Sequence, residues 1–181
     1  MLKVTNLSKS YGKKKVVDDV SFEIQKGKVT SFIGPNGAGK STVLSIISRL
    51  LKRTEGTIII GDKKLDEWHT NELAKVLGIL KQSNDVHMRL TVEELVSFGR
   101  FPYSQTKLTS EDWDYINKAL IFMELVDIKD SYLDELSGGQ KQRAYIAMVI
   151  AQDTEYILLD EPLNNLDIKH SIQMMKTLNK L

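Results

Sequence analysis

The chain has 181 residues, which corresponds to about one domain and is long enough to bury a substantial core. Its 25 basic and 24 acidic residues leave a net charge of +1, which argues against a polyanion such as nucleic acid as the main partner. Cysteine is absent, so disulfides, thiolate metal sites and cysteine catalysis are excluded. The sequence has neither a signal-peptide pattern nor an apolar run of about 20 residues. We therefore expect a soluble intracellular protein that meets a membrane through a partner.

The first third of the chain alternates between predicted strands and a helix. Apolar and polar residues alternate over 20–24, which indicates a strand with one wet face. The short apolar run Val29–Ile33 predicts a buried strand, and the glycine-rich stretch that follows it opens a helix over 42–51. A further strand is expected over 57–60, ending in a Gly-Asp turn.

The rest of the chain is richer in helices. A helix over 70–77 precedes a strand at 78–80, and residues 88–135 contain helical patterns without a strand candidate. Ser137 is a candidate cap for a helix through Ile150, and Tyr156–Leu159 is an apolar strand. Strands that alternate with helices predict an α/β fold with a mostly parallel sheet. The alternating strands near the start add an antiparallel β layer, and 88–135 an inserted helical subdomain.

One glycine-rich segment has the composition of a phosphate-binding loop. Glycines let backbone N–H groups curl around phosphate oxygens, and the helix that follows presents its positive N-terminus to them. A lysine adds a charge for the β/γ-phosphates, and the next hydroxyl can bind Mg²⁺. The segment comprises Gly34, Pro35, Asn36, Gly37, Ala38, Gly39, Lys40 and Ser41, followed by Thr42.

Two acids follow the apolar strand at 156–159. Asp160 stands where the carboxyl ends of strands bind ligands in open α/β sheets, and it is placed to hold Mg²⁺. Glu161 beside it is a candidate base for an attacking water. By themselves these acids also fit a simple turn. Together with the phosphate loop they indicate a nucleoside triphosphatase.

A second anion-binding helix start is predicted further along the chain. It comprises Leu136, Ser137, Gly138, Gly139 and Gln140. One chain has no need of two such sites for one triphosphate, so the second fits a nucleotide bound to another subunit. Here the sequence resembles the ATP-binding-cassette (ABC) ATPase family over its whole length. Residues 34–41 match the Walker A loop, 136–140 the signature, and Asp160 the Walker B carboxylate.

The resemblance implies further roles. Glu161 matches the catalytic glutamate and Tyr11 the aromatic residue that stacks on adenine. Gln82 matches the Q-loop glutamine that senses Mg²⁺, and Asp167 the aspartate of the D-loop, although the two asparagines before Leu166 depart from the commoner Ser-Ala. The family implies ATP and Mg²⁺ as ligands and an ATP-dependent homodimer. One cassette domain is expected over 1–181, with a core at 1–87 and 136–181 and a helical subdomain at 88–135.

The absence of a long coiled coil or a second cassette favours a transporter subunit over a soluble ABC machine acting on DNA or the ribosome. The stretch from Val96 to Tyr103 and the segment 160–171 resemble ATPases of bacterial iron–siderophore importers, with haem or vitamin B12 importers as alternatives. The family's partners would be permease subunits and, indirectly, a substrate-binding protein, which places the chain on the inner face of the cell membrane. Leu90, Phe98, Phe101 and Tyr103 are expected either to receive a permease helix or to pack the subdomain.

The family also has a switch histidine about 30 residues after the catalytic glutamate, and the sequence ends at Leu181. His170 is too close to Glu161 to take that role. We therefore expect a C-terminally shortened cassette whose residues 1–181 bind ATP but hydrolyse it slowly, because a fixed donor for the developing γ-phosphate charge is missing.

Overall fold

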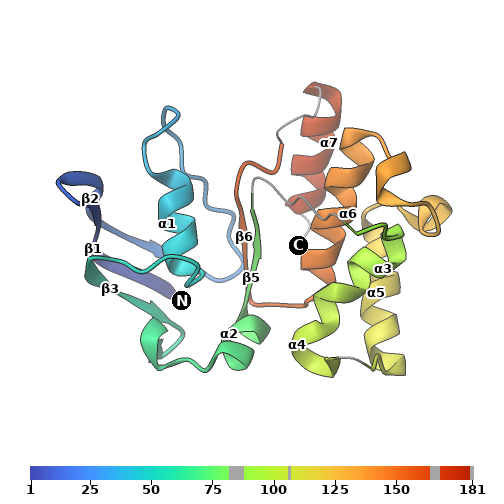
Figure 1. Cartoon of the computed structure of the whole chain (residues 1–181), viewed down its shortest axis with the longest axis horizontal. Helices are drawn as coiled ribbons and strands as arrows, with labels where there is room; N and C mark the ends of the chain where they lie inside the picture. Colours follow the sequence, from blue (N-terminus) through green and yellow to red (C-terminus); the bar gives the residue numbers. More distant parts are fainter. Residues whose placement is uncertain (82–87, 106, 164–167, 180–181) are drawn as a thin grey trace. The chain divides into compact units, whose positions relative to one another are not determined.

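The computed structural model describes residues 1–81, 88–105, 107–163 and 168–179. By their internal contacts these residues form two compact units, Met1–Leu73 and Ala74–Leu181. Figure 1 shows the succession of elements along the chain. Within the described residues, no helix has both the length and the hydropathy that crossing a bilayer requires.

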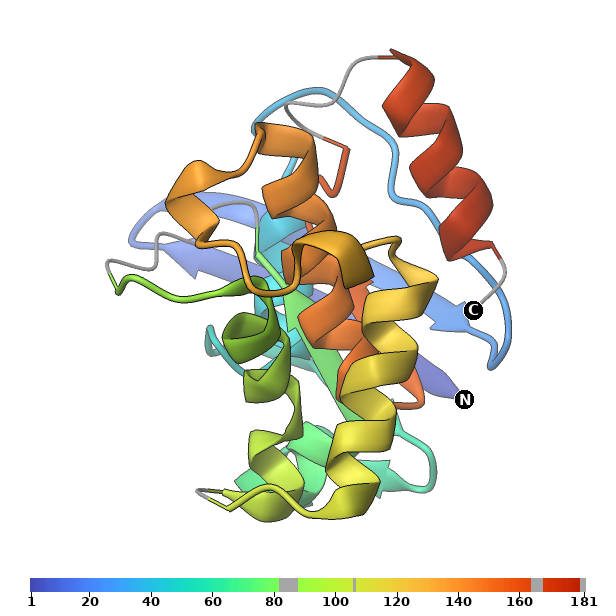
Figure 2. The ribbon, with the colours of Figure 1, turned by 90° about the vertical axis from the view of Figure 1, so that its right-hand side faces the viewer.

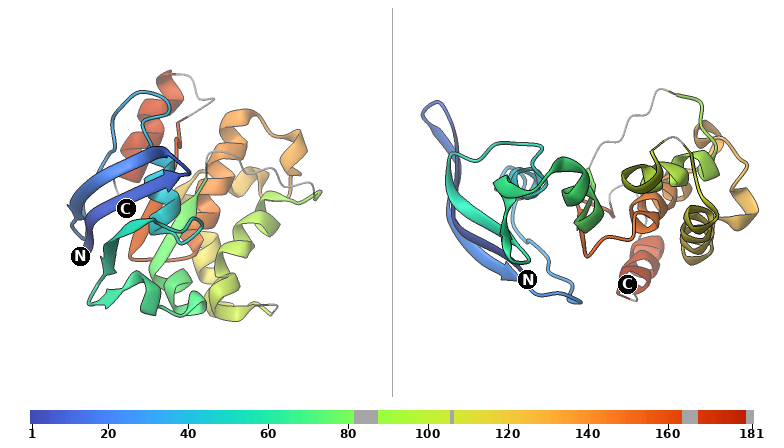
Figure 3. Two further views of the ribbon diagram at one scale, coloured as in Figure 1. Left: turned by 60° about the vertical axis from the view of Figure 1, so that its left-hand side comes forward. Right: turned by 90° about the horizontal axis from the view of Figure 1, so that it is seen from below.

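An antiparallel sheet forms the larger part of the first unit. Its strands are β1 (Leu2–Tyr11), β2 (Lys14–Ile24), β3 (Glu55–Ile60) and β4 (Lys63–Lys64), in the order β2-β1-β3-β4. Leu2 pairs with Ile24 on one side and with Ile60 on the other. Figure 3 shows the long β1–β2 hairpin. The antiparallel layer expected from the sequence is confirmed, as is the alternation of exposure along 20–24.

Helix α1 (Lys40–Ile47) supplies the apolar layer against this sheet. Val43, Leu44, Ile46 and Ile47 are buried on it, at the spacing of a single helix face. The 3₁₀ turn η1 (Leu65–Glu67) and helix α2 (Thr70–Val76) follow the sheet. Arg53 ties η1 to the strand start through Asp66 and the carbonyl of Gly56, to which its Nε donates at 2.8 Å.

The prediction of a strand over Val29–Ile33 is wrong. None of the described strands pairs with this segment, and Val29 and Ile33 are 61% and 96% exposed. Only Phe32 makes an aromatic contact with the sheet, edge-on to Phe22 with ring centroids 5.0 Å apart. Apolar composition predicts burial but does not supply a hydrogen-bonded neighbour, and without a ladder the segment keeps an irregular backbone.

The second unit is a helical layer on a short parallel strand pair. Strand β5 (Leu77–Leu80) pairs with β6 (Tyr156–Leu159), with Leu77 opposite Tyr156 and Leu80 opposite Leu159. The parallel pairing expected from alternating strands and helices is confirmed. The helices are α3 (Val92–Ser97), α4 (Phe101–Ser104), α5 (Ser110–Phe122), α6 (Gly138–Ala151) and α7 (Ile168–Leu178), with 3₁₀ turns η2 (Phe98–Arg100), η3 (Val126–Ile128) and η4 (Leu133–Glu135).

The helical character of 88–135 is confirmed for its described residues, where Thr91 and Tyr132 form just an isolated bridge. Two capping boxes start its main helices: the Thr91 hydroxyl accepts from the Glu94 N–H, and Thr109 does so from Asp112. Helix α6 packs between α3 and α5, as Figure 2 shows. The shared core includes Val92, Leu95, Ile116, Leu120, Ala144 and Ala147.

A buried ion pair joins η2, α5 and the end of α6. A Cβ atom on Gly99 would lie 2.1 Å from the carbonyl oxygen of Met148, so only glycine allows this approach. The approach brings the Arg100 side chain, 4% exposed, within 2.9 Å of Asp112 through its Nε, while its Nη1 donates to the Ala151 carbonyl at 2.9 Å. The Gly-Arg segment that resembles importer ATPases is therefore part of the packing of this unit.

Both carboxylate oxygens of Asp112 accept hydrogen bonds. Burial alone would raise the pKa of its carboxyl group, but hydrogen bonds from Ser104, from the N–H and hydroxyl of Thr109, and from Arg100 together hold that pKa well below its usual range. The guanidinium of Arg100 also lies 4.0 Å from the ring centroid of Tyr103 and 4.1 Å from that of Tyr115. The buried charges of Arg100 and Asp112 therefore compensate each other.

Replacing Arg100 by methionine should destabilise the second unit strongly, because Asp112 then stays buried without its cation. We expect the free energy of unfolding to fall by about 3–5 kcal/mol, measured by urea denaturation near neutral pH. The lowered pKa means that Asp112 contributes stability above its unfolded-state pKa of about 4, and that this contribution is lost as the pH falls.

The matched control is Lys63→Met, which removes the exposed ion pair with Glu72, 3.3 Å between Nζ and Oε2. Its urea midpoint should stay close to that of the wild type. Equal midpoints for the two variants would show that the buried pair adds nothing beyond an exposed one.

Candidate nucleotide-binding site

The phosphate loop predicted at 34–41 lies in the first unit and leads directly into α1. Gly37 and Gly39 have φ angles of 81° and 88°, in the left-handed region that favours glycine. Gly39 is the residue that caps α1, and a Cβ on it would lie 2.8 Å from the carbonyl oxygen of Val16. Glycine at 39 thus lets the helix start approach the β2 backbone.

The first turn of α1 is open to an anion. No described side chain caps it, and it contains no acidic residue. Its N–H groups and the helix dipole therefore face the exposed loop 34–38. The Lys40 Nζ donates to the carbonyl oxygens of Gly34 and Pro35 at 2.9 and 3.0 Å. The ammonium group is thus held over the loop, where it can meet the oxygens of a bound phosphate.

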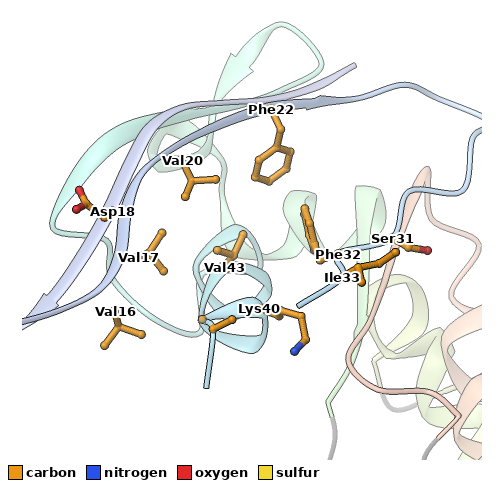
Figure 4. Close-up of a pocket in the computed structure, with 12 residues that line it drawn as sticks. Val16, Val17, Asp18, Val20, Phe22, Ser31, Phe32, Ile33, Lys40 and Val43 are labelled. Atoms are coloured by element: carbon orange, nitrogen blue, oxygen red, sulfur yellow. The ribbon is translucent and has the colours of Figure 1, made fainter. Parts of the chain in front are cut away.

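A pocket of about 300 Å³ adjoins the loop within the same unit. Figure 4 shows Val17, Val20 and Phe22 extending from β2 toward Val43 on α1, with Lys40 at the start of that helix. The lining is mostly apolar and comprises Val16, Val17, Asp18, Val20, Phe22, Ser31, Phe32, Ile33, Ala38, Gly39, Lys40 and Val43.

Tyr11 lies at the end of β1 rather than in this pocket. Its side chain is 52% exposed, and it pairs in register with Lys14 across the hairpin. The Lys9 Nζ lies 4.9 Å from its ring centroid. The ring is therefore accessible for stacking, in a basic surrounding that suits a nucleotide.

The two acids predicted to act on the nucleotide follow β6 in the second unit. The Asp160 N–H donates to the Leu80 carbonyl at 2.9 Å, which extends the β5–β6 ladder by one residue. Glu161 then has φ 52°, and the chain turns sharply at Pro162. Such a conformation costs about 1–3 kcal/mol for a residue other than glycine, and the proline that follows restricts it further. Backbone strain of this kind is typical of functional sites.

The signature segment forms the start of α6. The Ser137 hydroxyl accepts from the Gln140 N–H at 3.3 Å, and the Ser137 N–H donates to the Gln140 Oε1 at 2.9 Å. Ser137 and Gly138 are exposed, while Leu136, Gly139 and Gln140 are partly buried. The Ser-Gly-Gly helix start expected from the sequence is present, and Gln140 completes a capping box that the Ser-x-x-Gln spacing also encodes.

A contact that the sequence did not reveal joins this helix to the turn formed by Asp160, Glu161 and Pro162, called the acidic turn below. The Gln142 Nε2 donates to the Pro162 carbonyl at 3.0 Å. The two residues are 20 positions apart, so no local pattern reveals the contact. Gln82 and Asp167 lie outside the described residues. Among those described, no three His, Asp or Glu side chains gather as a metal cluster.

Comparison with known families covers most of the chain. The model of the ABC transporter family matches residues 17–164, from within β2 to just past Pro162. The chain belongs to the ABC transporter family. The family and the fold predicted from the sequence are thereby confirmed, and the cassette is an ATPase that binds ATP.

Curated relatives of this cassette match along its whole length. The petrobactin import ATP-binding protein YclP of Bacillus subtilis is 62% identical over 181 residues, covering 100% of this chain and 72% of that protein. The iron(3+)-hydroxamate import ATP-binding protein FhuC of the same species is 40% identical over 99% of this chain and 68% of its own length. Among solved structures, a dimeric post-hydrolysis state of the cassette MJ0796, bound to ADP and Pi, has a TM-score of 0.85 at 32% identity, covering 100% of this chain and 82% of that one.

Lys40→Ala should weaken Mg·ATP binding by at least tenfold, because the ammonium held over the loop is a charge-assisted donor to phosphate. Tyr11→Ala should weaken it by about 1–3 kcal/mol and Tyr11→Phe much less, since the stacking ring is kept. Titration with a fluorescent ATP analogue measures each affinity.

Lys118→Ala is the control, because it removes an exposed cation of α5, which belongs neither to the loop nor to the β1–β2 hairpin that carries Tyr11. Unchanged affinity in Lys40→Ala would contradict the assigned phosphate contact. Equal losses in Tyr11→Phe and Tyr11→Ala would place the adenine elsewhere.

Proposed function

We propose that this ABC ATPase powers a bacterial importer of iron–siderophore complexes. The observation that carries the proposal is the match over all 181 residues, at 62% identity, to a petrobactin import ATP-binding protein. The 40% match to an iron(3+)-hydroxamate import protein supports the wider class of ferric chelates rather than one compound. Import of haem or vitamin B12 is the alternative that substrate tests would reveal.

Each predicted site residue has a role in this proposal. Lys40 and the backbone of 34–42 bind the phosphates, Tyr11 stacks on adenine, and Glu161 accepts the proton of the attacking water. Ser41, Asp160 and Gln82 are the candidate ligands for Mg²⁺, and Asp167 is assigned to contact between subunits. Support comes from the open first turn of α1 and from the strained turn at Glu161.

The residues present fit a magnesium ion in chemical type. A hydroxyl and a carboxylate are the hard oxygen donors that Mg²⁺ prefers, and Mg²⁺ usually takes only one or two protein ligands besides water and phosphate. The lack of a dense carboxylate cluster among the described residues is therefore compatible with this metal. Bound Mg²⁺ would neutralise phosphate charge, while Lys40 and the α1 N-terminus orient the triphosphate.

We further infer that two copies of the chain pair around two ATP molecules. The start of α6 carries Ser137 and two glycines, and the N–H groups of Gly138 and Gly139, which are not used by the capping box, suit an anion supplied by a second subunit. A twofold pair would use the phosphate loop of one chain and residues 136–140 of its partner at each nucleotide. The dimeric MJ0796 cassette, bound to ADP and Pi, supports the pairing of two cassettes by analogy.

Glu161→Gln should form the dimer most clearly, because loss of the base lets ATP persist. We expect a shift from monomer to dimer in saturating Mg·ATP, measured by analytical ultracentrifugation. Adding Ser137→Arg, which blocks the exposed helix start, should abolish the shift without reducing the affinity for ATP. A Glu161→Gln protein that stays monomeric under these conditions would contradict the pairing.

The permease is proposed to dock on the helical subdomain assigned to 88–135, with the ATPase held at the inner membrane face. Of the four apolar residues considered for this contact, the structure leaves Phe98 and Phe101 46% and 58% exposed. Leu90 instead packs against the core. The Tyr103 ring is 37% exposed, and the Lys75 ammonium and the Arg100 guanidinium lie 5.1 and 4.0 Å from its centroid. The docking proposal thus rests on two phenylalanines.

Iron uptake tests the function. In cells that carry the gene for this ATPase together with its permease and binding protein, Lys40→Ala in that gene should abolish uptake of ⁵⁵Fe-labelled siderophore. Phe101→Glu should lower uptake and leave ATP binding intact, whereas Ile121→Glu, an equally exposed apolar site on α5, should do neither. Uptake of labelled haem or cobalamin alone would replace the proposed substrate class.

A further inference from the structure

The hydrogen bond between Gln142 and Pro162 ties the signature helix to the turn that carries the proposed base. Gln142 is the fifth residue of α6, one turn beyond the exposed start of that helix. Its Nε2 donates to the Pro162 carbonyl at 3.0 Å, and the contact is partly buried. Because Pro162 directly follows Glu161, the bond restrains the backbone next to the proposed base.

The turn needs such a restraint. Strand hydrogen bonding ends where the Asp160 N–H meets the Leu80 carbonyl, one residue before Glu161. Glu161 then takes φ 52° in front of a proline, a combination that the chain does not favour by itself. Pro162 has no N–H, so its carbonyl is the backbone group through which that residue can be held.

We propose that Gln142 is a positioning residue for hydrolysis, which acts by holding the peptide that aims the Glu161 carboxylate. The first turn of the same helix contains Gly138 and Gly139, whose N–H groups lie between the two bonds of the capping box. A nucleotide bound there is linked through one turn of helix to the base in the same chain. This inference rests on the proposed function, in which Glu161 is the base and 136–140 meet the partner's ATP.

The test compares three substitutions in the full chain. Gln142→Met keeps the length of the side chain and loses the donor, whereas Gln142→Lys keeps an N–H donor of similar reach. Gln152→Met is the matched control, because the Gln152 Nε2 donates to the Ala74 carbonyl at 2.5 Å from the other end of α6. That substitution removes the same kind of bond away from the acidic turn.

Single-turnover hydrolysis, with enzyme in excess over labelled ATP, measures even slow chemistry. Gln142→Met should lower the rate by about 10- to 100-fold, the size of effect expected when a reacting group is slightly misplaced, with the affinity for ATP within about twofold of wild type. Gln142→Lys should recover most of the rate, and Gln152→Met should keep it. A wild-type rate in Gln142→Met, or an equal loss in Gln152→Met, would overturn the proposal.

A double variant separates this inference from the proposed function. If Gln142 acts through Glu161, then Gln142→Met should add no further loss to Glu161→Gln. A wild-type rate in Glu161→Gln alone would refute the assigned base. Additive losses would refute the positioning role alone.

Hydrogen exchange of the peptide spanning 156–163 gives a readout without turnover. It should be faster in Gln142→Met than in the wild type and unchanged in Gln152→Met. Unchanged exchange in Gln142→Met would count against the restraint.

Discussion

The burial of helix α6 is the constraint on which the second unit depends. Six of its fourteen residues are buried, among them Ala144, Ala147 and Ala151, whose small side chains let neighbouring elements come close. Gly99 approaches the Met148 carbonyl so tightly that no side chain fits between them, and Arg100 then covers the end of the helix at Ala151. The position of this helix therefore determines where both the signature and the acidic turn are held.

In the first unit, the candidate phosphate-binding site is built mainly from backbone groups. The left-handed glycines at 37 and 39 and the uncapped start of α1 provide N–H groups, and a single cation, Lys40, lies over the loop. The carbonyl oxygens of Gly34 and Pro35 accept hydrogen bonds from that ammonium group. A bound phosphate would therefore compete with these two carbonyl oxygens for the Lys40 ammonium group.

Much of this arrangement could be predicted from the sequence, because local chemistry decides it. Thr91, Thr109 and Ser137 each start a helix with a capping box that the spacing encodes, and the apolar strand before Asp160 is equally local. Val29–Ile33 could not be assigned, since an apolar run does not say which strand will pair with it. The buried Arg100 and the reach of Gln142 were also hidden, because both depend on partners 12 to 51 residues away.

The residues of α6 differ in how far they are exposed to solvent. Ser137 and Gly138 face solvent and Gly139–Arg143 are partly buried, whereas the run from Ala144 to Ala147 is fully covered. Local opening is easiest where few apolar contacts must be broken, so one helix combines a labile first turn with a stable second half. If this turn meets a phosphate as proposed, it can adjust locally while the buried half of the helix keeps its packing.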